Sequence, residues 1–374
     1  MPKQVVAMFL RSWLVLVVAA ASVVLAPHDR AAAQQPAGGQ LQFLPVRGNI
    51  HVLQGAGANI TVSIGRDGVL MVDSGLASMG DHVLAAIRRL QAQLDLREKP
   101  LGWGAETRSS IADRHVESPA KPIRYIVNTH AHPDHVGANE LLRRSGMTFT
   151  GGNVAGNIAD ASEGAAIMAH EAVLMRMTST AGGATPAPPD AQPTDTYYTD
   201  TMKLSHFFNG EGVQLIHQPT AHTDGDTLVW FRGSDVIAAG DLYSTVSYPV
   251  IDVKQGGTID GVVNGLNRIL RLSIAEFRTE GGTLIVPGHG RLSDSADVAY
   301  YRDMVTILRD RVKAMVTKGM TLDQVKAAKL TADYDPRYGA TSGLWTTDQF
   351  IEAAYISLGG GKPAPARTTQ GRSR

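Results

Sequence analysis

Three histidines and one aspartate lie within six positions of the sequence, in the stretch HAHPDH. His130 and His132 are two residues apart, and Asp134 and His135 follow after a single proline. Imidazole and carboxylate groups bind zinc, and a catalytic zinc ion takes three protein ligands and keeps one position open for water. The stretch is therefore a candidate metal site. A polar turn that happens to be rich in histidine is the alternative, which these residues alone leave open.

Three more candidate ligands occur singly, each in a turn after an apolar run. His222 lies in PTAHTDGD, Asp241 in AAGDLY and His289 in VPGHG. An apolar strand that ends in a sharp turn with one polar residue is typical of a loop that carries function. The chain has no cysteine, so a metal site must consist of histidine and carboxylate ligands.

The elements that position these residues alternate between sheet and helix. Short β-branched runs with turn signals predict strands, and apolar residues at helical spacing predict helices. Strands are expected at 49–55, 59–65, 68–75, 123–130, 212–219, 227–231, 235–243 and 282–290. Helices are expected at 79–94, 136–146, 258–273, 293–318, 321–330 and 347–358. Asp81 is a candidate N-cap of the first helix, and His170 lies in a further helix-like run.

The order of these elements predicts an α/β fold with two similar halves. Residues 178–195 are rich in proline, glycine, alanine and threonine, which is typical of a linker between them. Two halves, each a sheet with helices, favour a four-layer αββα sandwich over one doubly wound sheet. We expect a catalytic domain at 44–292, C-terminal helices packed on it at 293–362, and a disordered tail at 363–374.

The N-terminus predicts export. Lys3 and Arg11 flank or precede an apolar run of 15 residues from Ser12 to Ala26, and AAAQQ then offers a small-residue cleavage site. We expect a signal peptide at 1–33, a leader at 34–43, and a periplasmic or secreted protein that is not held in the membrane after cleavage. An uncleaved anchor is the alternative.

Composition limits the choice of partners. Lys+Arg and Asp+Glu both total 35, so no basic excess indicates nucleic-acid binding. A small-molecule substrate is the expected partner, and the sequence does not indicate an oligomeric state. Residues 95–121 form a long polar insertion, for which a mobile surface loop is the simplest interpretation.

Taken together, the motifs resemble those of the metallo-β-lactamase-fold hydrolases. The resemblance runs from about Leu41 to Gly290 and carries, in the family's order, VLMVDSG, HAHPDH, AHTDGD, AAGDLY and VPGHG. A single motif is a moderate signal, whereas all of them in order are highly specific.

The resemblance implies a site for two metal ions. His130, His132 and His222 would hold one ion; Asp134, His135 and His289 would hold the other; Asp241 would bridge them. Asp134 would also be catalytic, because it could orient a hydroxide and shuttle a proton. Related di-iron oxygen reductases have a carboxylate at the position of His132, so a site rich in imidazole favours two Zn²⁺ ions, although iron or manganese would also be accepted.

Four neighbours are candidates for supporting roles. Asp73, in VDSG, would hydrogen-bond a ligand histidine, or would simply be a turn residue. Tyr243, Tyr248 and Lys254 follow Asp241 in the sequence and are candidates for substrate binding. Packing for the tyrosines and solvation for the lysine are the alternatives.

The resemblance implies an exported zinc-dependent hydrolase, in which metal-bound hydroxide attacks the carbonyl of an ester, lactone, thioester or β-lactam-like substrate. Asp241 departs from the pattern of β-lactamases proper and resembles that of glyoxalase II-type thioesterases and lactonases. We therefore expect a broad-specificity hydrolase with weak β-lactamase activity. The alternatives are an iron-dependent redox enzyme on the same fold, similar to persulfide dioxygenases, and a non-catalytic zinc-binding protein.

Overall fold

A computed structural model describes residues 41–94, 122–147, 164–274 and 281–361 of the chain. The predicted signal peptide (1–33), the insertion (95–121) and the tail (363–374) lie outside the described residues, as does the predicted leader up to residue 40. The first described strand begins at Gln42, within the stretch predicted as a leader.

The first sheet has seven strands among the described residues, in the order of the chain. They are β1 (Gln42–Arg47), β2 (Ile50–Gln54), β3 (Ile60–Gly65), β4 (Gly68–Val72), β5 (Ile123–Val127), β6 (Ala166–His170) and β7 (Asp195–Tyr197). The first four pair antiparallel, and β4 to β7 pair parallel. The parallel strands therefore end at one edge of the sheet, where polar loop residues can meet.

The second sheet has six described strands, in the order β13-β12-β11-β10-β9-β8. They are β8 (Thr201–Lys203), β9 (Val213–His217), β10 (Thr227–Phe231), β11 (Val236–Ala238), β12 (Leu284–Val286) and β13 (Ser293–Asp294). β11 and β12 pair parallel, so their C-terminal ends lie side by side.

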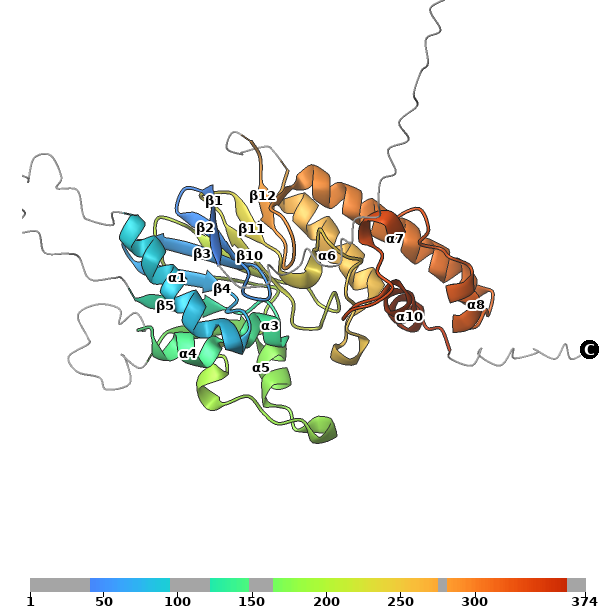
Figure 1. Ribbon diagram of the computed structural model, residues 1–374, viewed down its shortest axis with the longest axis horizontal. Coiled ribbons are helices and arrows are strands. Elements are labelled where there is room, and N and C mark those ends of the chain that lie inside the picture. Colours follow the sequence, from blue (N-terminus) through green and yellow to red (C-terminus); the bar gives the residue numbers. More distant parts are fainter. Residues whose placement is uncertain (1–40, 95–121, 148–163, 275–280, 362–374) are drawn as a thin grey trace, which may run out of the picture.

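The longer helices lie outside the two sheets (Figure 1). The first half supplies α1 (Gly80–Gln93), α3 (Pro133–Val136), α4 (Asn139–Arg144) and α5 (Glu171–Thr178). The second half supplies α6 (Ile259–Leu272), α7 (Ser295–Thr317), α8 (Leu322–Ala327), α9 (Asp335–Tyr338) and α10 (Thr347–Ser357). Figure 1 shows α1 and α4 on one side of the strands and α6, α7, α8 and α10 on the other.

Three apolar clusters fill the spaces between the layers. One lies between the sheets and includes Val72 and Val127 of the first sheet and Phe231 of the second. A second lies between the first sheet and α1, and a third joins the second sheet to α6, α7 and α10. Each sheet therefore buries one face against the other sheet and its opposite face against helices, which confirms the predicted four-layer α/β sandwich with a helical C-terminal region.

The spacing of apolar residues predicts the helices well, but the prediction for the N-cap of α1 is less accurate. Val83, Ile87 and Leu90 are buried on one face of α1, as the spacing predicts. The prediction that Asp81 caps this helix is wrong, because Met79 is the N-cap residue and Asp81 lies in the first turn. At this position its charge still interacts favourably with the helix dipole. Thr258 caps α6 by accepting a hydrogen bond from the backbone N–H of Gly261 at 2.9 Å.

Candidate metal centre

The stretch HAHPDH begins where β5 ends and runs into α3. Thr129 and His130 follow the strand, and Pro133 opens the short helix, where a missing N–H costs nothing. His130 and His135 are buried, whereas the side chains of His132 and Asp134 are 21% and 30% exposed. The stretch therefore contains two buried candidate ligands, His130 and His135, and two that are partly exposed to solvent, His132 and Asp134.

The three distant residues reach the same place from the second sheet. His222 lies in the turn between β9 and β10, Asp241 in the 3-10 turn after β11, and His289 in the loop after β12. Gly240 allows the close approach of the two halves, because its φ is +52° and an added Cβ would lie 2.7 Å from the Oγ1 of Thr129. The parallel pairing of β11 and β12 brings Asp241 and His289 to one edge.

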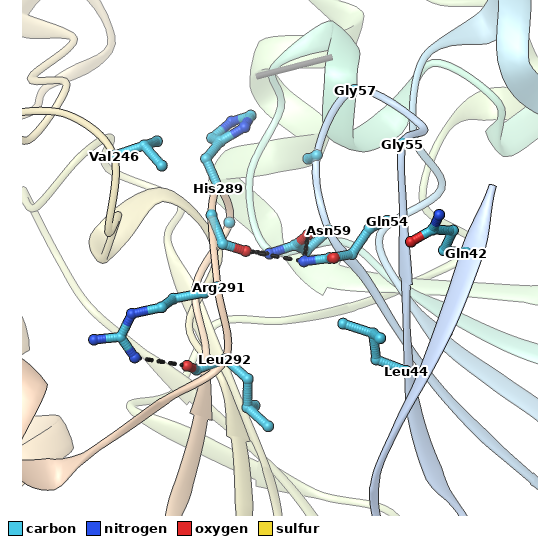
Figure 2. A pocket seen from close by; sticks show the side chains of 13 residues that line it. Gln42, Leu44, Gln54, Gly55, Gly57, Asn59, Val246, His289, Arg291 and Leu292 are labelled. Atoms are coloured by element: carbon cyan, nitrogen blue, oxygen red, sulfur yellow. Dashed lines mark hydrogen bonds between the residues drawn. The ribbon is translucent and has the colours of Figure 1, made fainter. Parts of the chain in front are cut away.

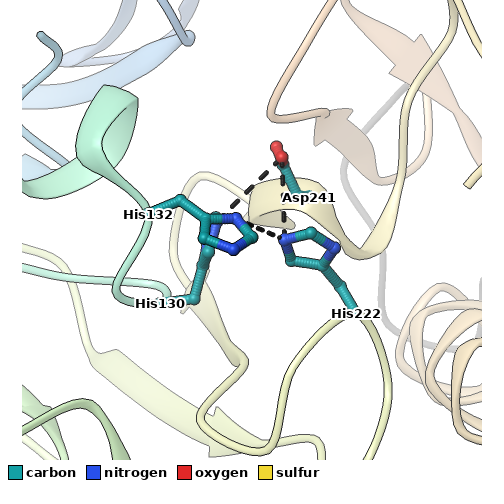
Figure 3. Close-up of side chains that lie close together, drawn as sticks. All are labelled: His130, His132, His222 and Asp241. Atoms are coloured by element: carbon teal, nitrogen blue, oxygen red, sulfur yellow. Dashed lines mark hydrogen bonds and ion pairs between the residues drawn. The ribbon is translucent and has the colours of Figure 1, made fainter. Parts of the chain in front are cut away.

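The structure brings all seven predicted metal ligands together in two groups. The first ligand group contains His130, His132, His222 and Asp241, and the second ligand group contains Asp134, His135 and His289. Within each group the candidate ligand atoms lie within 4.8 Å of one another. In the first group, the Nδ1 atom of His132 lies 2.9 Å from Nε2 of His222 and 3.2 Å from Nε2 of His130 (Figure 3).

Asp241 faces both ligand groups, one carboxylate oxygen to each. Its Oδ2 atom lies 4.0 Å from Nε2 of His130 and 3.9 Å from Nε2 of His222. Its Oδ1 atom lies 3.1 Å from Nε2 of His135 and 3.3 Å from Nε2 of His289. This is the arrangement that a carboxylate bridging two cations requires.

The outward-facing nitrogens of four histidines have partners that orient the rings. Nδ1 of His130 lies 3.0 Å from Oγ1 of Thr129, and Nδ1 of His222 lies 2.7 Å from the carbonyl of Val250. Two carboxylates hold the other two rings, as described below. Partners of this kind fix the tautomer, so that the inward nitrogen presents its lone pair. Lone pairs that converge at about 3 Å favour a cation at their centre.

Asp73 is one of these carboxylates. Its Oδ2 atom lies 2.7 Å from Nδ1 of His135, and it also accepts hydrogen bonds from the backbone N–H and the hydroxyl of Thr129, both at 2.8 Å. It is buried and adopts a φ of +66°. Of the two interpretations of Asp73, the geometry fits the one in which it supports a ligand histidine.

Asp252 is the other carboxylate, and no sequence motif indicates its role. Its Oδ2 atom lies 3.0 Å from Nε2 of His132, and its backbone N–H donates to the carbonyl of His222 at 2.9 Å. The hydrogen bond with His132 lowers the pKa of this carboxyl well below its usual range, against the effect of burial. Asp252 lies in a loop with no motif around it, so its role depends on a contact between residues 120 positions apart.

We expect Asp252→Asn to weaken metal binding in the first ligand group by about 10- to 100-fold, the usual cost of losing a carboxylate behind a ligand histidine. The amide can still accept a hydrogen bond but no longer carries the charge that increases the basicity of His132. Competition with a chromophoric chelator would measure the affinity for each zinc equivalent. Unchanged affinity for both equivalents would contradict this role.

The ligand side chains fit a metal ion, because two of their buried polar atoms lack a hydrogen-bond partner among the described residues. Nε2 of His135 and Oδ1 of Asp241 are buried and have no hydrogen-bond partner among the described residues, although they lie 3.1 Å apart. Because Nδ1 of His135 faces Asp73, loss of the proton on Nε2 would leave both atoms with lone pairs that face each other. Such buried, unsatisfied acceptors are rare in proteins, and a bound cation would satisfy both.

The charges of the ligand side chains also favour a cation. Burial opposes ionisation of Asp241, but His289 and His135 outweigh it and hold its pKa well below the usual range. Burial lowers the pKa of His130 far below its usual value, with His135 and His222 adding to the effect. Asp241, against the effect of burial, and Asp134 raise the pKa of His289 to about 10. A metal ion would therefore displace protons from the second ligand group as it binds.

Two of the predicted substrate residues lie elsewhere. Tyr243 and Tyr248 are 2% and 1% exposed and belong to the apolar cluster under α6 and α7. The hydroxyl of Tyr243 donates to Ser293, and that of Tyr248 donates to Asp335. The prediction that these tyrosines bind substrate is wrong, because the chain turns after Asp241 and directs both rings into the core. Lys254 is exposed, and substrate binding by it stays a prediction.

A cavity of about 550 Å³ adjoins His289 (Figure 2), within the usual size of small-molecule sites. Its lining includes Leu44, Gln54, Asn59 and Arg291. The guanidinium of Arg291 is already paired with Asp297 at 2.6 Å, so the cavity has little uncompensated charge.

A family model described as the metallo-beta-lactamase superfamily matches residues 54–289. Two curated relatives, from Bacillus cereus and Bacillus sp. (strain 170), are both named Metallo-beta-lactamase type 2. Each is 22% identical over 185 residues, which is 50% of this chain and 59% and 58% of the respective relatives. The chain thus spans less than two thirds of the length of the curated relatives that it matches.

A solved structure of similar fold is the stereoselective inverting sec-alkylsulfatase Pisa1 from Pseudomonas sp.. The TM-score is 0.56 at 14% identity, and the match covers 86% of this chain and 51% of that one. A double mutant of the same sulfatase gives a TM-score of 0.59 at 14% identity, with the same coverage. At this identity the likeness shows the fold alone.

Proposed function

This chain belongs to the metallo-beta-lactamase superfamily, and on that premise we propose that it is an exported, zinc-dependent hydrolase. The substrate would be a small molecule with an ester, lactone, thioester or β-lactam-like carbonyl. The observation that carries the proposal is the position of Asp241, whose two carboxylate oxygens face different ligand groups. A carboxylate in this position suits two cations that lie close together.

Zinc suits the donor set best. The seven side chains offer imidazole and carboxylate groups and no thiolate, a set that also accepts iron or manganese. Two bound zinc ions would polarise the scissile carbonyl and lower the pKa of a water molecule from ~15.7 towards ~7, so that it can attack at neutral pH. The work left to the protein is to hold the ions, orient the reactants and move a proton.

Asp134 is the residue we assign to proton transfer. Its Oδ2 atom lies 3.3 Å from Nε2 of His289 and 3.8 Å from Nε2 of His135, and its side chain is 30% exposed. Burial opposes ionisation, but the contact with His289 and the charge of His135 outweigh it, so the pKa of Asp134 is below its usual value. An ionised carboxylate that borders both the ligand group and solvent can orient a water molecule and accept its proton.

The substrate range that we propose is broad. The curated relatives are named as β-lactamases, which supports an acyl substrate, whereas the bridging Asp241 resembles thioesterases and lactonases. Apart from His289 and Arg291, which is paired with Asp297, the cavity is lined by apolar and neutral polar residues, so it suits an uncharged acyl group. Weak β-lactamase activity beside a better lactone or ester substrate is our expectation.

Export would place this chemistry outside the cytoplasm. The proposal rests on residues 1–33, whose charged start, apolar run and small-residue site are typical of a signal peptide. Within the described residues, no helix is long and apolar enough to cross a membrane.

The test is a substrate panel combined with metal analysis. Protein purified without added metal is analysed for zinc, iron and manganese, then loaded with zinc and assayed with esters, lactones, thioesters and β-lactams. We expect two zinc ions per chain and hydrolysis of at least one class. Stoichiometric iron with oxygen consumption would instead favour the redox alternative, and two bound zinc ions with no hydrolysis of any class would favour the zinc-binding protein.

A further inference from the structure

We infer that Asn59 is a positioning residue that sets the place of His289 in the second ligand group; the inference rests on the proposed metal centre. Asn59 lies in the turn between β2 and β3 of the first sheet and is 9% exposed. His289 lies in a loop of the second sheet, 230 positions later in the chain. The side chain of Asn59 connects the two sheets at the edge where the ligands meet.

Three hydrogen bonds from Asn59 bracket His289. The Nδ2 atom donates to the carbonyl of Pro287 at 2.9 Å and to the carbonyl of Gly290 at 3.0 Å. The backbone N–H of Asn59 donates to the carbonyl of Gly288 at 2.8 Å. The residues before and after His289 are thus both hydrogen-bonded to Asn59. Figure 2 shows the side chain of Asn59 beside the loop that carries His289.

Gln54 reinforces this contact. Its Nε2 atom donates to the carbonyl of Gly290 at 3.0 Å and to Oδ1 of Asn59 at 3.3 Å. Both amide groups line the cavity beside His289, but their donors point at the loop. The donors are therefore already used in holding the loop and are not free for a substrate.

The loop that carries His289 needs contacts with other parts of the chain, because its glycines allow many backbone conformations. Gly288 and Gly290 flank His289, and Gly290 adopts a φ of +100°. Gly288 cannot be replaced by a more rigid residue, since an added Cβ would lie 2.0 Å from Oδ1 of Asp241. Two glycines around a ligand leave it with many accessible conformations, so partners outside the loop must select one.

The loop has partners within its own sheet, but these do not fix it relative to the other ligands. The N–H of Gly288 donates to the carbonyl of Gly240, and the N–H of Thr245 donates to the carbonyl of His289. Asp134 and His135, however, lie in α3, which follows β5 of the first sheet. Asn59 lies in a turn of this sheet, and Gly57 of the same turn packs so that an added Cβ would lie 3.2 Å from Cβ of Asp134. Asn59 therefore sets the distance between ligands that come from different sheets.

The contact pattern predicts a selective effect. In the first ligand group, the carbonyl of Val250 holds His222 and Asp252 holds His132. Among the described residues, Asn59 forms no hydrogen bond with either histidine. Loss of the Asn59 amide should weaken one metal site and spare the other. Loss of the Asp252 carboxylate should weaken metal binding in the first ligand group and spare the second.

The test variant is Asn59→Asp, which keeps the size of the side chain but turns the two donors into an oxygen that faces two carbonyl oxygens. We expect one zinc equivalent to bind at least about 10-fold more weakly, the lower limit for losing a supporting group, while the other keeps its affinity. Chelator competition measures both equivalents. Wild-type affinity for both, or equal weakening of both, would overturn the inference.

A matched control separates this effect from lost stability. Asn209 also donates two hydrogen bonds from Nδ2, to the carbonyl of Gly68 at 3.0 Å and to Oγ of Ser63 at 3.1 Å. These bonds lie at the N-terminal end of β4, away from the ligand groups. Asn209→Asp should lower the unfolding temperature and leave both zinc affinities unchanged. A selective loss of one equivalent in this control would show that the effect of Asn59→Asp is nonspecific, and would overturn the inference.

Gln54→Met is the second variant, needed if Asn59→Asp does not fold. It preserves volume and removes the bond to Gly290, so the same zinc equivalent should weaken by a smaller factor; unchanged affinity would overturn the inference. Wild-type protein that fails to bind two zinc ions would instead overturn the proposed metal centre. The two failures are therefore distinguishable.

Discussion

Asp241→Asn should bind one zinc ion tightly where we expect the wild-type protein to bind two. Its carboxylate faces both ligand groups, through Oδ1 at 3.1 Å from Nε2 of His135 and Oδ2 at 3.9 Å from Nε2 of His222. An amide offers one neutral oxygen and a nitrogen that repels cations. We expect at least about 100-fold weaker binding of one equivalent, the upper limit for a supporting residue and hence a minimum for a direct ligand.

Zinc titration followed by chelator competition measures this loss, and hydrolysis should fall in parallel because one of the two ions is missing. Asp224→Asn is a suitable control. Asp224 lies two residues from His222, but its carboxylate pairs with Arg176 at the surface. If Asp241→Asn retained two tightly bound ions, the bridging role would be wrong.

Asp134→Asn should lower turnover by about 10²- to 10⁴-fold, the range expected for loss of a general acid–base group. The asparagine side chain retains an oxygen for the second ligand group but cannot accept a proton. At saturating zinc the variant should therefore hold two ions and still be slow. Steady-state kinetics with the best substrate of the panel, together with metal analysis, separates the two effects.

Glu140→Gln is the matched control for this variant. It also neutralises a carboxylate close to the HAHPDH stretch, but Glu140 lies at the surface and pairs with Arg144 at 2.9 Å. It should keep wild-type turnover. Asp134→Asn protein with two zinc ions and undiminished turnover would rule out our mechanism.

The sequence predicted the architecture well where the hydrophobic pattern is long. The apolar stripe of α6 gives a helix from Ile259 to Leu272, and the runs of β-branched residues give β3 and β5. It did less well where elements are short and join directly. β6 is buried throughout and is followed at once by α5, so the run around His170 resembles one helix although His170 ends the strand and caps α5.

The candidate site shows the same division. Its ligand positions have motifs around them, and the structure brings all of them together. Asp252 has none, because the contact that gives it meaning joins residues far apart in the sequence. Tyr243 and Tyr248 were selected because they follow Asp241 in the chain, yet neighbours in the sequence point in different directions once the backbone turns. Proximity along the chain is weak evidence for a shared cavity.

Each ligand group contains residues from both halves of the protein. The packing of the core therefore sets the distance between the ligands of the proposed metal centre. His130 and His135 come from the first sheet, while His222 and His289 come from the second. Metal ions would hold the sheets together, and the apolar cluster between the sheets would hold the chelate closed. By thermodynamic linkage the two effects are reciprocal. A substitution in the core far from any ligand, for instance at Phe231, would therefore change the metal affinity.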